Sequence, residues 1–153
     1  KAANVNFGRN QEFAPELFKI LNRHREVISA YISVLGPRKM LMPHQGPWSG
    51  VLRMHLGVVI PGHKECVLIN GGEEYHWEEG KVVLFDDTYE HVAINTTDQI
   101  RAVLFLDIMR PLKQPWAFIN WFILRVSILF PYVWVPYFRH RRWEKKFYRT
   151  FKQ

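Results

Sequence analysis

Residues 43–60, PHQGPWSGVLRMHLGVVI, combine two histidines and an arginine with turn-forming and strand-forming residues. Prolines and glycines in the first half predict a loop. The second half, residues 51–60, reads as a strand that becomes wholly apolar towards its end. Because side chains alternate along a strand, Arg53 and His55 share one face. With His44 on the preceding loop, the stretch indicates a cavity that binds an anion and a metal.

Short strands are predicted on both sides of this stretch. Each is rich in β-branched or aromatic residues, and turn-forming residues follow each one. Asn70-Gly71-Gly72 is a strong hairpin signal, and no helical pattern lies between the strands. The chain is therefore predicted to be mainly β, a cupin-like jelly roll or double-stranded β-helix. The predicted strands cover residues 27–35, 66–69, 73–77, 82–85, 91–95 and 100–107.

Helices are predicted only near the two ends. Apolar residues recur at helical spacing after Pro15, so residues 14–24 are expected to form an amphipathic helix packed on the outside of a sheet. With 153 residues, 48% of them hydrophobic, the chain can bury one core. We expect a jelly-roll oxygenase domain over residues 1–114 and a tail over residues 115–153. The chain opens at Lys1 without a signal-peptide pattern, so we expect it to be cropped or processed.

Histidines and arginines of the predicted barrel supply candidate ligands. Histidine is the commonest metal ligand, although a single one is more often a structural residue. A guanidinium facing the interior must be paired with an acid such as Asp107, or it awaits an anionic ligand. Both explanations stay open. One cysteine excludes an internal disulfide and a thiolate metal cluster. The candidates are His44, His55, His91, Arg53 and Arg101.

The triplet that begins at His44 departs from a common iron site. Mononuclear iron oxygenases normally hold Fe(II) by two histidines and one carboxylate. The first histidine and the carboxylate usually lie two residues apart, but here the triplet is His44-Gln45-Gly46, and glycine has no side chain to ligate a metal. Asp86, Asp87 or Glu90, close to His91, could provide the missing carboxylate. Acids just before a strand are more often turn formers.

Four ordered segments between residues 33 and 111 resemble the aspartyl/asparaginyl β-hydroxylase family of Fe(II)/2-oxoglutarate dioxygenases. They are PHQGP, VLRMHLGVVIP, WEEGKVVLFDDTYEH and IRAVLFLDIMRPL. The animal enzymes of this family are similar in having glycine in place of the carboxylate ligand, with water completing the metal shell, so Gly46 fits the family.

The resemblance implies a role for six residues of this sequence. His44 and His91 are expected to bind iron, and Arg101 to pair with the distal carboxylate of 2-oxoglutarate. The rest of the cosubstrate pocket is expected to consist of Ser33, Arg53 and His55. The activity implied is hydroxylation of a substrate C–H bond with O2. His91 and Asn95 also have the His-x3-Asn spacing found in cupins.

The tail is apolar first and basic afterwards. Residues 116–130 form a largely apolar run in which Arg125 is the only charge, and as a helix they would rise about 22 Å, too short for a hydrocarbon core of roughly 30 Å. Residues 139–153 then hold seven Lys and Arg against Glu144 alone, which is +6 of the net charge of +7. Dense aromatics followed by basic residues favour peripheral contact with the inner, cytoplasmic face of a membrane.

Other interpretations of the tail and of the substrate stay open. The apolar run could be a helix packed on the barrel, with a solvated basic end. Basic residues among aromatics can also hold single-stranded nucleic acid, but no nucleic-acid fold accompanies them, so no such partner is expected. The tail resembles that of bacterial lipid A hydroxylases, whereas Gly46 favours a peptidyl Asp/Asn hydroxylase. We favour a membrane-associated acyl chain such as that of lipid A. A non-catalytic cupin-like binding module is the further alternative.

Overall fold

The computed structural model describes residues 10–129, 135, 138–139 and 142. The chain divides into two compact units, one of residues 26–110 and one that joins residues 1–25 to residues 111–153. The first unit contains all eight strands of the described residues and carries every predicted site residue. The predicted oxygenase domain over residues 1–114 stays a prediction.

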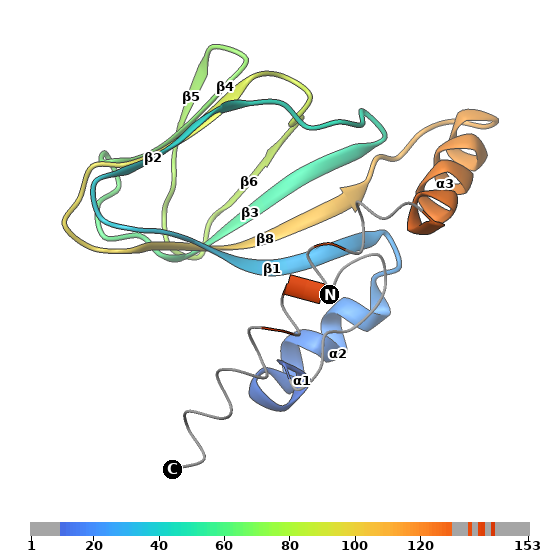
Figure 1. Ribbon diagram of the computed structural model, residues 1–153, viewed down its shortest axis with the longest axis horizontal. Helices are drawn as coiled ribbons and strands as arrows, with labels where there is room; N and C mark the ends of the chain where they lie inside the picture. The colour runs from blue at the N-terminus through green and yellow to red at the C-terminus, as the bar shows by residue number, and fades with distance from the viewer. Residues whose placement is uncertain (1–9, 130–134, 136–137, 140–141, 143–153) are drawn as a thin grey trace. The chain divides into compact units, whose positions relative to one another are not determined.

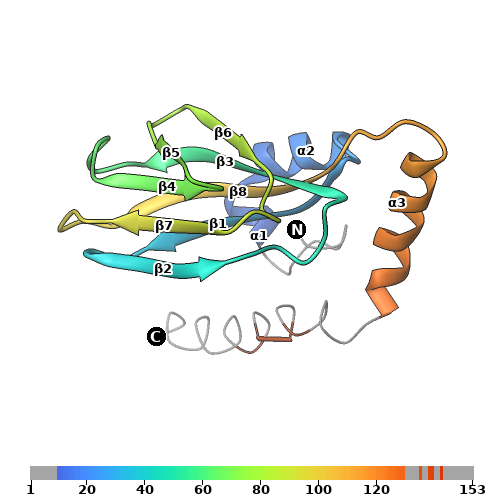
Figure 2. The same ribbon diagram turned by 90° about the horizontal axis from the view of Figure 1, so that it is seen from above.

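The eight strands form two four-stranded antiparallel sheets that face each other (Figure 1). The first sheet has the order β1 (Val27–Leu35), β8 (Arg101–Met109), β3 (Val51–Val59) and β6 (Val82–Phe85). The second has the order β2 (Lys39–His44), β7 (His91–Asn95), β4 (Cys66–Asn70) and β5 (Glu73–His76), and Figure 2 shows these four strands side by side. The chain passes from one sheet to the other repeatedly, which confirms the predicted jelly roll.

Two local features show where sequence patterns succeeded and failed. Gly71 and Gly72 join β4 to β5 with φ of 58° and 89°, which confirms the predicted hairpin, because both central residues of a type I′ turn need positive φ. In contrast, β2 was missed. His44 was assigned to a loop, but it ends this strand. Pro43 is tolerated there because β2 lies at the edge of its sheet.

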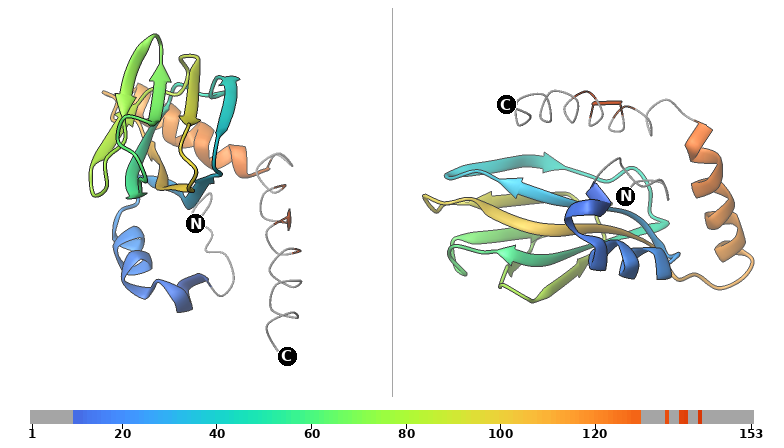
Figure 3. Two further views of the ribbon diagram at one scale, coloured as in Figure 1. Left: turned by 90° about the vertical axis from the view of Figure 1, so that its left-hand side faces the viewer. Right: turned by 90° about the horizontal axis from the view of Figure 1, so that it is seen from below.

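The core lies between the two sheets. It consists of buried side chains from both layers, and burying each large one contributes roughly 1.5–3 kcal/mol. The two layers are seen from two further sides in Figure 3. The core residues are Cys66, Leu68, Trp77, Phe85, Ala93 and Val103.

The other unit contains the described helices. These are α1 (Asn10–Phe13), α2 (Pro15–Arg23), α3 (Trp116–Val126) and the 3-10 turn η1 (Ser127–Leu129). The helix α2 confirms the prediction for residues 14–24, and its packing on a sheet stays a prediction. The basic cluster of residues 139–153 lies outside the described residues, apart from Arg139 and Arg142. Among the described helices, none is long and apolar enough to cross a membrane.

Candidate active site

Strand register places the predicted site residues of the first sheet on one face. Directly opposed residues of neighbouring antiparallel strands point to the same side of a sheet. The face continues across β1, β8 and β3 and includes all four predicted cosubstrate residues of this sheet. The pairs are Leu35–Arg101, Ser33–Val103, His55–Phe105 and Arg53–Asp107.

His44 and His91 come from the second sheet and lie side by side. They are register partners on β2 and β7, and their ring centroids are 4.2 Å apart. Nδ1 of His44 lies 2.7 Å from the carbonyl oxygen of Met42, and Nδ1 of His91 lies 3.0 Å from that of Tyr89. Because a carbonyl only accepts, each Nδ1 carries the hydrogen. Each Nε2 therefore keeps a lone pair for a metal.

The environment of His91 favours its neutral, metal-binding form. Burial is the largest cause that lowers the pKa of His91 below its ordinary value, and the nearby charges of His44 and Arg53 act in the same direction. A hydrogen bond to Tyr89 opposes this effect without reversing it.

The space next to Gly46 is filled by the carboxylate of Asp87. The Gly46 amide donates a hydrogen bond of 2.6 Å to the Asp87 carbonyl oxygen. A Cβ atom at position 46 would overlap both carboxylate oxygens of Asp87. A ligating Asp or Glu therefore has no room at position 46, and the nearest acidic group belongs to the segment before His91.

The three acids considered as a third metal ligand lie in different environments. Asp86 accepts hydrogen bonds from the amide and hydroxyl of Thr88 and pairs with Arg110, which makes it a turn former. Glu90 is exposed. Asp87 is 2% exposed, and burial raises the pKa of its carboxyl. Within the described part of the chain, no group of three His, Cys, Asp or Glu has the geometry to hold a metal.

Arg53 is already paired. Its Nη2 lies 2.8 Å from Asp87 Oδ2 and 3.3 Å from Asp107 Oδ1, and its guanidinium carbon lies 4.4 Å from the centre of the Phe105 ring. The hydroxyl of Ser29 donates a further hydrogen bond to Asp107. The sequence left open whether internal acids pair with the two arginines. For Arg53, they do. Its role as a cosubstrate contact stays a prediction.

Arg101 differs because it is buried without an acidic partner in the part of the chain that the structure describes. It is 2% exposed, and its Nε and Nη1 have no hydrogen-bond partner among the described residues. Its guanidinium carbon lies 4.4 Å over the ring of Trp77. Burial lowers the pKa of Arg101 to about 10, so it is still charged at neutral pH. A buried, unpaired guanidinium is costly, so this site favours an anionic ligand.

His55 adds a second polar group without a partner. It is buried, and neither ring nitrogen has a hydrogen-bond partner among the residues described. Burial, and then the charges of Arg101 and Arg53, lower the pKa of His55 to about 3, so the ring is neutral at pH 7. Ser33 lies on the same inward face, half-buried. His55 and Arg101 together supply donors that an anion can use.

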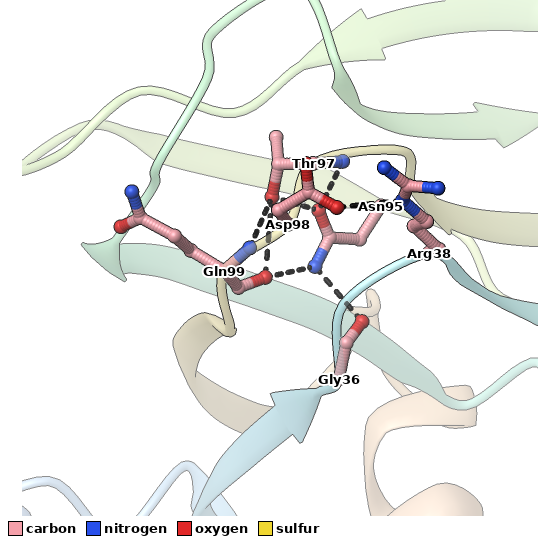
Figure 4. Close-up of polar contacts among 6 residues, drawn as sticks. All are labelled: Gly36, Arg38, Asn95, Thr97, Asp98 and Gln99. Atoms are coloured by element: carbon pink, nitrogen blue, oxygen red, sulfur yellow. Dashed lines mark hydrogen bonds and ion pairs between the residues drawn. The ribbon is translucent and has the colours of Figure 1, made fainter.

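Asn95 holds the turns beside the site (Figure 4). Its amide donates to the carbonyl oxygens of Gly36 and Gln99, at 2.9 and 2.8 Å, and its Oδ1 accepts from the amide and hydroxyl of Thr97. These bonds fix the end of β7 against the start of β8, which carries Arg101. The His-x3-Asn spacing pointed to this residue. The sequence indicated Asp87 only as a possible metal ligand, not as the partner of Arg53, and it contained no signal that set Trp77 apart as part of the site.

Known proteins with similar sequences include hydroxylases. The aspartyl/asparaginyl beta-hydroxylase family matches residues 1–111. The chain is 39% identical to an ornithine lipid ester-linked acyl 2-hydroxylase of Rhizobium tropici over 141 residues, 92% of this chain and 50% of that protein. It is 39% identical to the human aspartyl/asparaginyl beta-hydroxylase over 83 residues, 54% of this chain and 11% of that one. The chain thus spans half or less of these relatives.

Solved structures with similar coordinates include proteins of the cupin type. A predicted oxalate decarboxylase from Thermotoga maritima has a TM-score of 0.46 at 16% identity, covering 60% of this chain and 73% of that one. A Cupin_2 domain of a transcriptional regulator from Enterobacter cloacae also has a TM-score of 0.46, at 15% identity, covering 54% of this chain and 81% of that one. From its match over residues 1–111, the chain belongs to the aspartyl/asparaginyl β-hydroxylase family.

Proposed function

We propose that this chain carries the catalytic site of an Fe(II)/2-oxoglutarate-dependent hydroxylase that acts on a membrane-associated acyl chain. The observation that supports it best is the buried guanidinium of Arg101. It has no acidic partner among the described residues and lies on the inward face opposite the sheet that holds the two adjacent histidines. An anion and a metal thus have complementary sites on the two layers.

The residues present fit iron. His44 and His91 would hold Fe(II) through their Nε2 atoms, because both Nδ1 atoms are engaged with carbonyls. Gly46 supplies no ligand, so water would complete the shell beside the Asp87 carboxylate. When bound together, iron, 2-oxoglutarate and O2 supply the oxidising power for hydroxylation of a C–H bond.

The chain's own residues bind, orient and exclude water. Arg101 would pair with the distal carboxylate of 2-oxoglutarate, and its burial means that this pair forms away from solvent, where it is strongest. Neutral His55 can donate or accept one hydrogen bond next to it. The buried core side chains Trp77 and Val103 keep that end of the site dry.

Several observations favour an acyl substrate. The strand that ends at His44 exposes three apolar side chains in a row, Met40, Leu41 and Met42. An aliphatic chain is a suitable partner for exposed apolar side chains near a candidate metal ligand. The Rhizobium tropici relative acts on an ester-linked acyl chain. We therefore place ornithine-type lipids beside lipid A as candidate substrates.

A peptidyl substrate is the second candidate. It is favoured by Gly46 and by the identity with the human aspartyl/asparaginyl beta-hydroxylase. Incubating the iron-loaded protein separately with ornithine lipid, lipid A and an Asp/Asn-containing peptide, followed by mass spectrometry, distinguishes them. The substrate is the molecule that gains one oxygen atom.

Succinate release tests the activity itself. We expect release that requires iron and is abolished in Arg101→Ala. Arg38→Ala is the matched control, because this arginine is exposed and paired with Asp98 at the surface. Binding of 2-oxoglutarate without any succinate would overturn the enzymatic proposal in favour of a cupin-like binding module.

Contact with a membrane surface is the remaining part of the proposal. In α3, the side chains of Trp116, Phe118, Trp121 and Phe122 are 42–63% exposed. The chain has no Asp or Glu between Asp107 and Glu144. An aromatic helix followed by basic residues matches the interface of an anionic leaflet such as the inner face of a cell membrane.

Vesicle flotation tests this contact. We expect the protein to float with anionic phosphatidylglycerol vesicles and much less with zwitterionic ones. Changing both Phe118 and Phe122 to Ser should reduce flotation without affecting 2-oxoglutarate binding. Equal flotation of this variant would show that the helix is not the contact.

A further inference from the structure

Trp77 belongs to the core and also contacts the proposed anion site. It is 0% exposed and follows β5 directly. Its ring lies 4.4 Å from the guanidinium carbon of Arg101 and 5.8 Å from the ring of His55. One indole therefore lies beside Arg101 and His55. These are two of the four side chains with buried polar atoms that lack partners among the described residues, and the other two are Asn70 and Trp77 itself.

Arg101 needs an orienting contact that leaves its N–H groups available. Buried arginines are usually oriented by carboxylates, as Arg53 is by Asp87 and Asp107. A carboxylate beside Arg101 would compete with the ligand for the same donors. The face of an aromatic ring attracts a guanidinium without accepting its in-plane hydrogen bonds. Trp77 thus orients the Arg101 guanidinium and leaves its N–H donors available, whereas an acid would occupy them.

We propose that Trp77 is a positioning residue of the cosubstrate site, whose indole face holds the Arg101 guanidinium ready for the distal carboxylate of 2-oxoglutarate. This inference rests on the proposed function. It differs from simple core filling, for which an aliphatic side chain would serve as well as an aromatic one.

The expected effect on affinity follows from pre-organisation. The contact between ring and guanidinium exists before and after the anion binds, so most of its energy cancels. The part that does not cancel is the entropy cost of ordering the Arg101 side chain on binding. Without Trp77, this cost would raise the Kd about tenfold.

Calorimetric titration of 2-oxoglutarate, with Mn(II) in place of iron to prevent turnover, tests the inference. We expect Trp77→Leu to raise the Kd about tenfold, whereas Trp77→Phe, which keeps an aromatic face, stays within about threefold of the wild type. Leu68→Ala is the control, because Leu68 is buried in the same core and has no polar group to orient. It should lower thermal stability and leave the Kd unchanged.

A second measurement keeps a tryptophan at position 77, so it does not depend on the folding of a substituted variant. Replacing tryptophan with mono-, di- and trifluorotryptophan weakens cation–π attraction stepwise with little change of shape, so the Kd should rise stepwise. The same series in Trp77→Phe should show no trend, because the other five tryptophans then carry the label alone.

The outcomes separate the two proposals. A flat fluorination series, or an equal loss of affinity in Leu68→Ala, would show that Trp77 only fills the core and would overturn the inference. Absence of 2-oxoglutarate binding in the wild-type protein would instead overturn the proposed function, and this inference with it.

Discussion

Substituting Gly46 with alanine should disrupt the buried ion pair beside the histidines. The new Cβ would overlap the Asp87 carboxylate, which lies 2.8 Å from Arg53 Nη2. Restoring ordinary van der Waals distance requires a shift of more than about 1 Å, enough to break that pair. Gly46 has no positive φ, so alanine is acceptable to the backbone itself and the effect comes from the side chain.

The magnitude follows from the partners that remain. Deleting one member of a buried ion pair costs about 3–5 kcal/mol. Here Arg53 keeps Asp107, and the displaced carboxylate regains water, so we expect about 2 kcal/mol of lost stability for Gly46→Ala. In an Asp87→Ala background the overlap is absent, and the same substitution should cost less than about 0.5 kcal/mol.

Urea unfolding of the four proteins, with a chelator present to remove metal, measures this double-mutant cycle. The expected coupling between the two positions is about 1.5–2 kcal/mol. Equal stability of Gly46→Ala and the wild type would refute the reasoning. So would an equal loss in both backgrounds, because it would place the cause in the backbone.

Three further predictions concern protons, metal and hydrogen bonds. The pKa of His55 is lowered from 6.5 to about 3 in the folded protein, so the unfolded chain binds more protons between these values, and stability should fall as pH drops from 6.5 towards 3, by up to roughly 4 kcal/mol. His55→Asn should flatten that dependence in unfolding curves. Mn(II) binding, followed by electron paramagnetic resonance, should weaken below about pH 6 and disappear in His44→Ala/His91→Ala, because the ligands must be neutral imidazoles. Unchanged binding at pH 5 would exclude these ligands. Asn95→Ala should cost about 3 kcal/mol, because it leaves the partly buried carbonyls of Gly36 and Gln99 and the amide of Thr97 without this partner, and Asn95→Asp should not restore the lost donors.

Local pattern predicted most of the strands and the face on which the site lies. Alternation placed Arg53 beside His55, and the structure keeps that register. The strand β2 was not predicted because Lys39–His44 shows no alternation of apolar and polar residues and contains a proline. Its side chains are mostly exposed at the edge of the sheet. Edge strands depend on their neighbours for their conformation, and a single sequence does not specify neighbours.

The pairing of the two arginines depends on tertiary contacts, which the sequence alone does not show. Arg53 and Arg101 look alike in sequence, since each alternates with apolar residues on a strand. Of these two arginines, Asp87 from a distant turn pairs with Arg53, and Trp77 stacks on Arg101. These contacts join residues 24 or more positions apart. They decide which of the two arginines is available for the proposed anionic ligand. The metal, the cosubstrate and the substrate remain proposals.

The proposed metal ligands, His44 and His91, and the proposed anion-binding residue, Arg101, come from opposite sheets. If these roles hold, a dicarboxylate bound by both sets of residues would reach across the interior, and its length would have to match the distance between the layers. Core side chains such as Ala93 and Val103 lie between the layers and contribute to this distance. Small volume changes in these side chains should shift the preference between 2-oxoglutarate and dicarboxylates one carbon longer or shorter, although none of them binds either molecule.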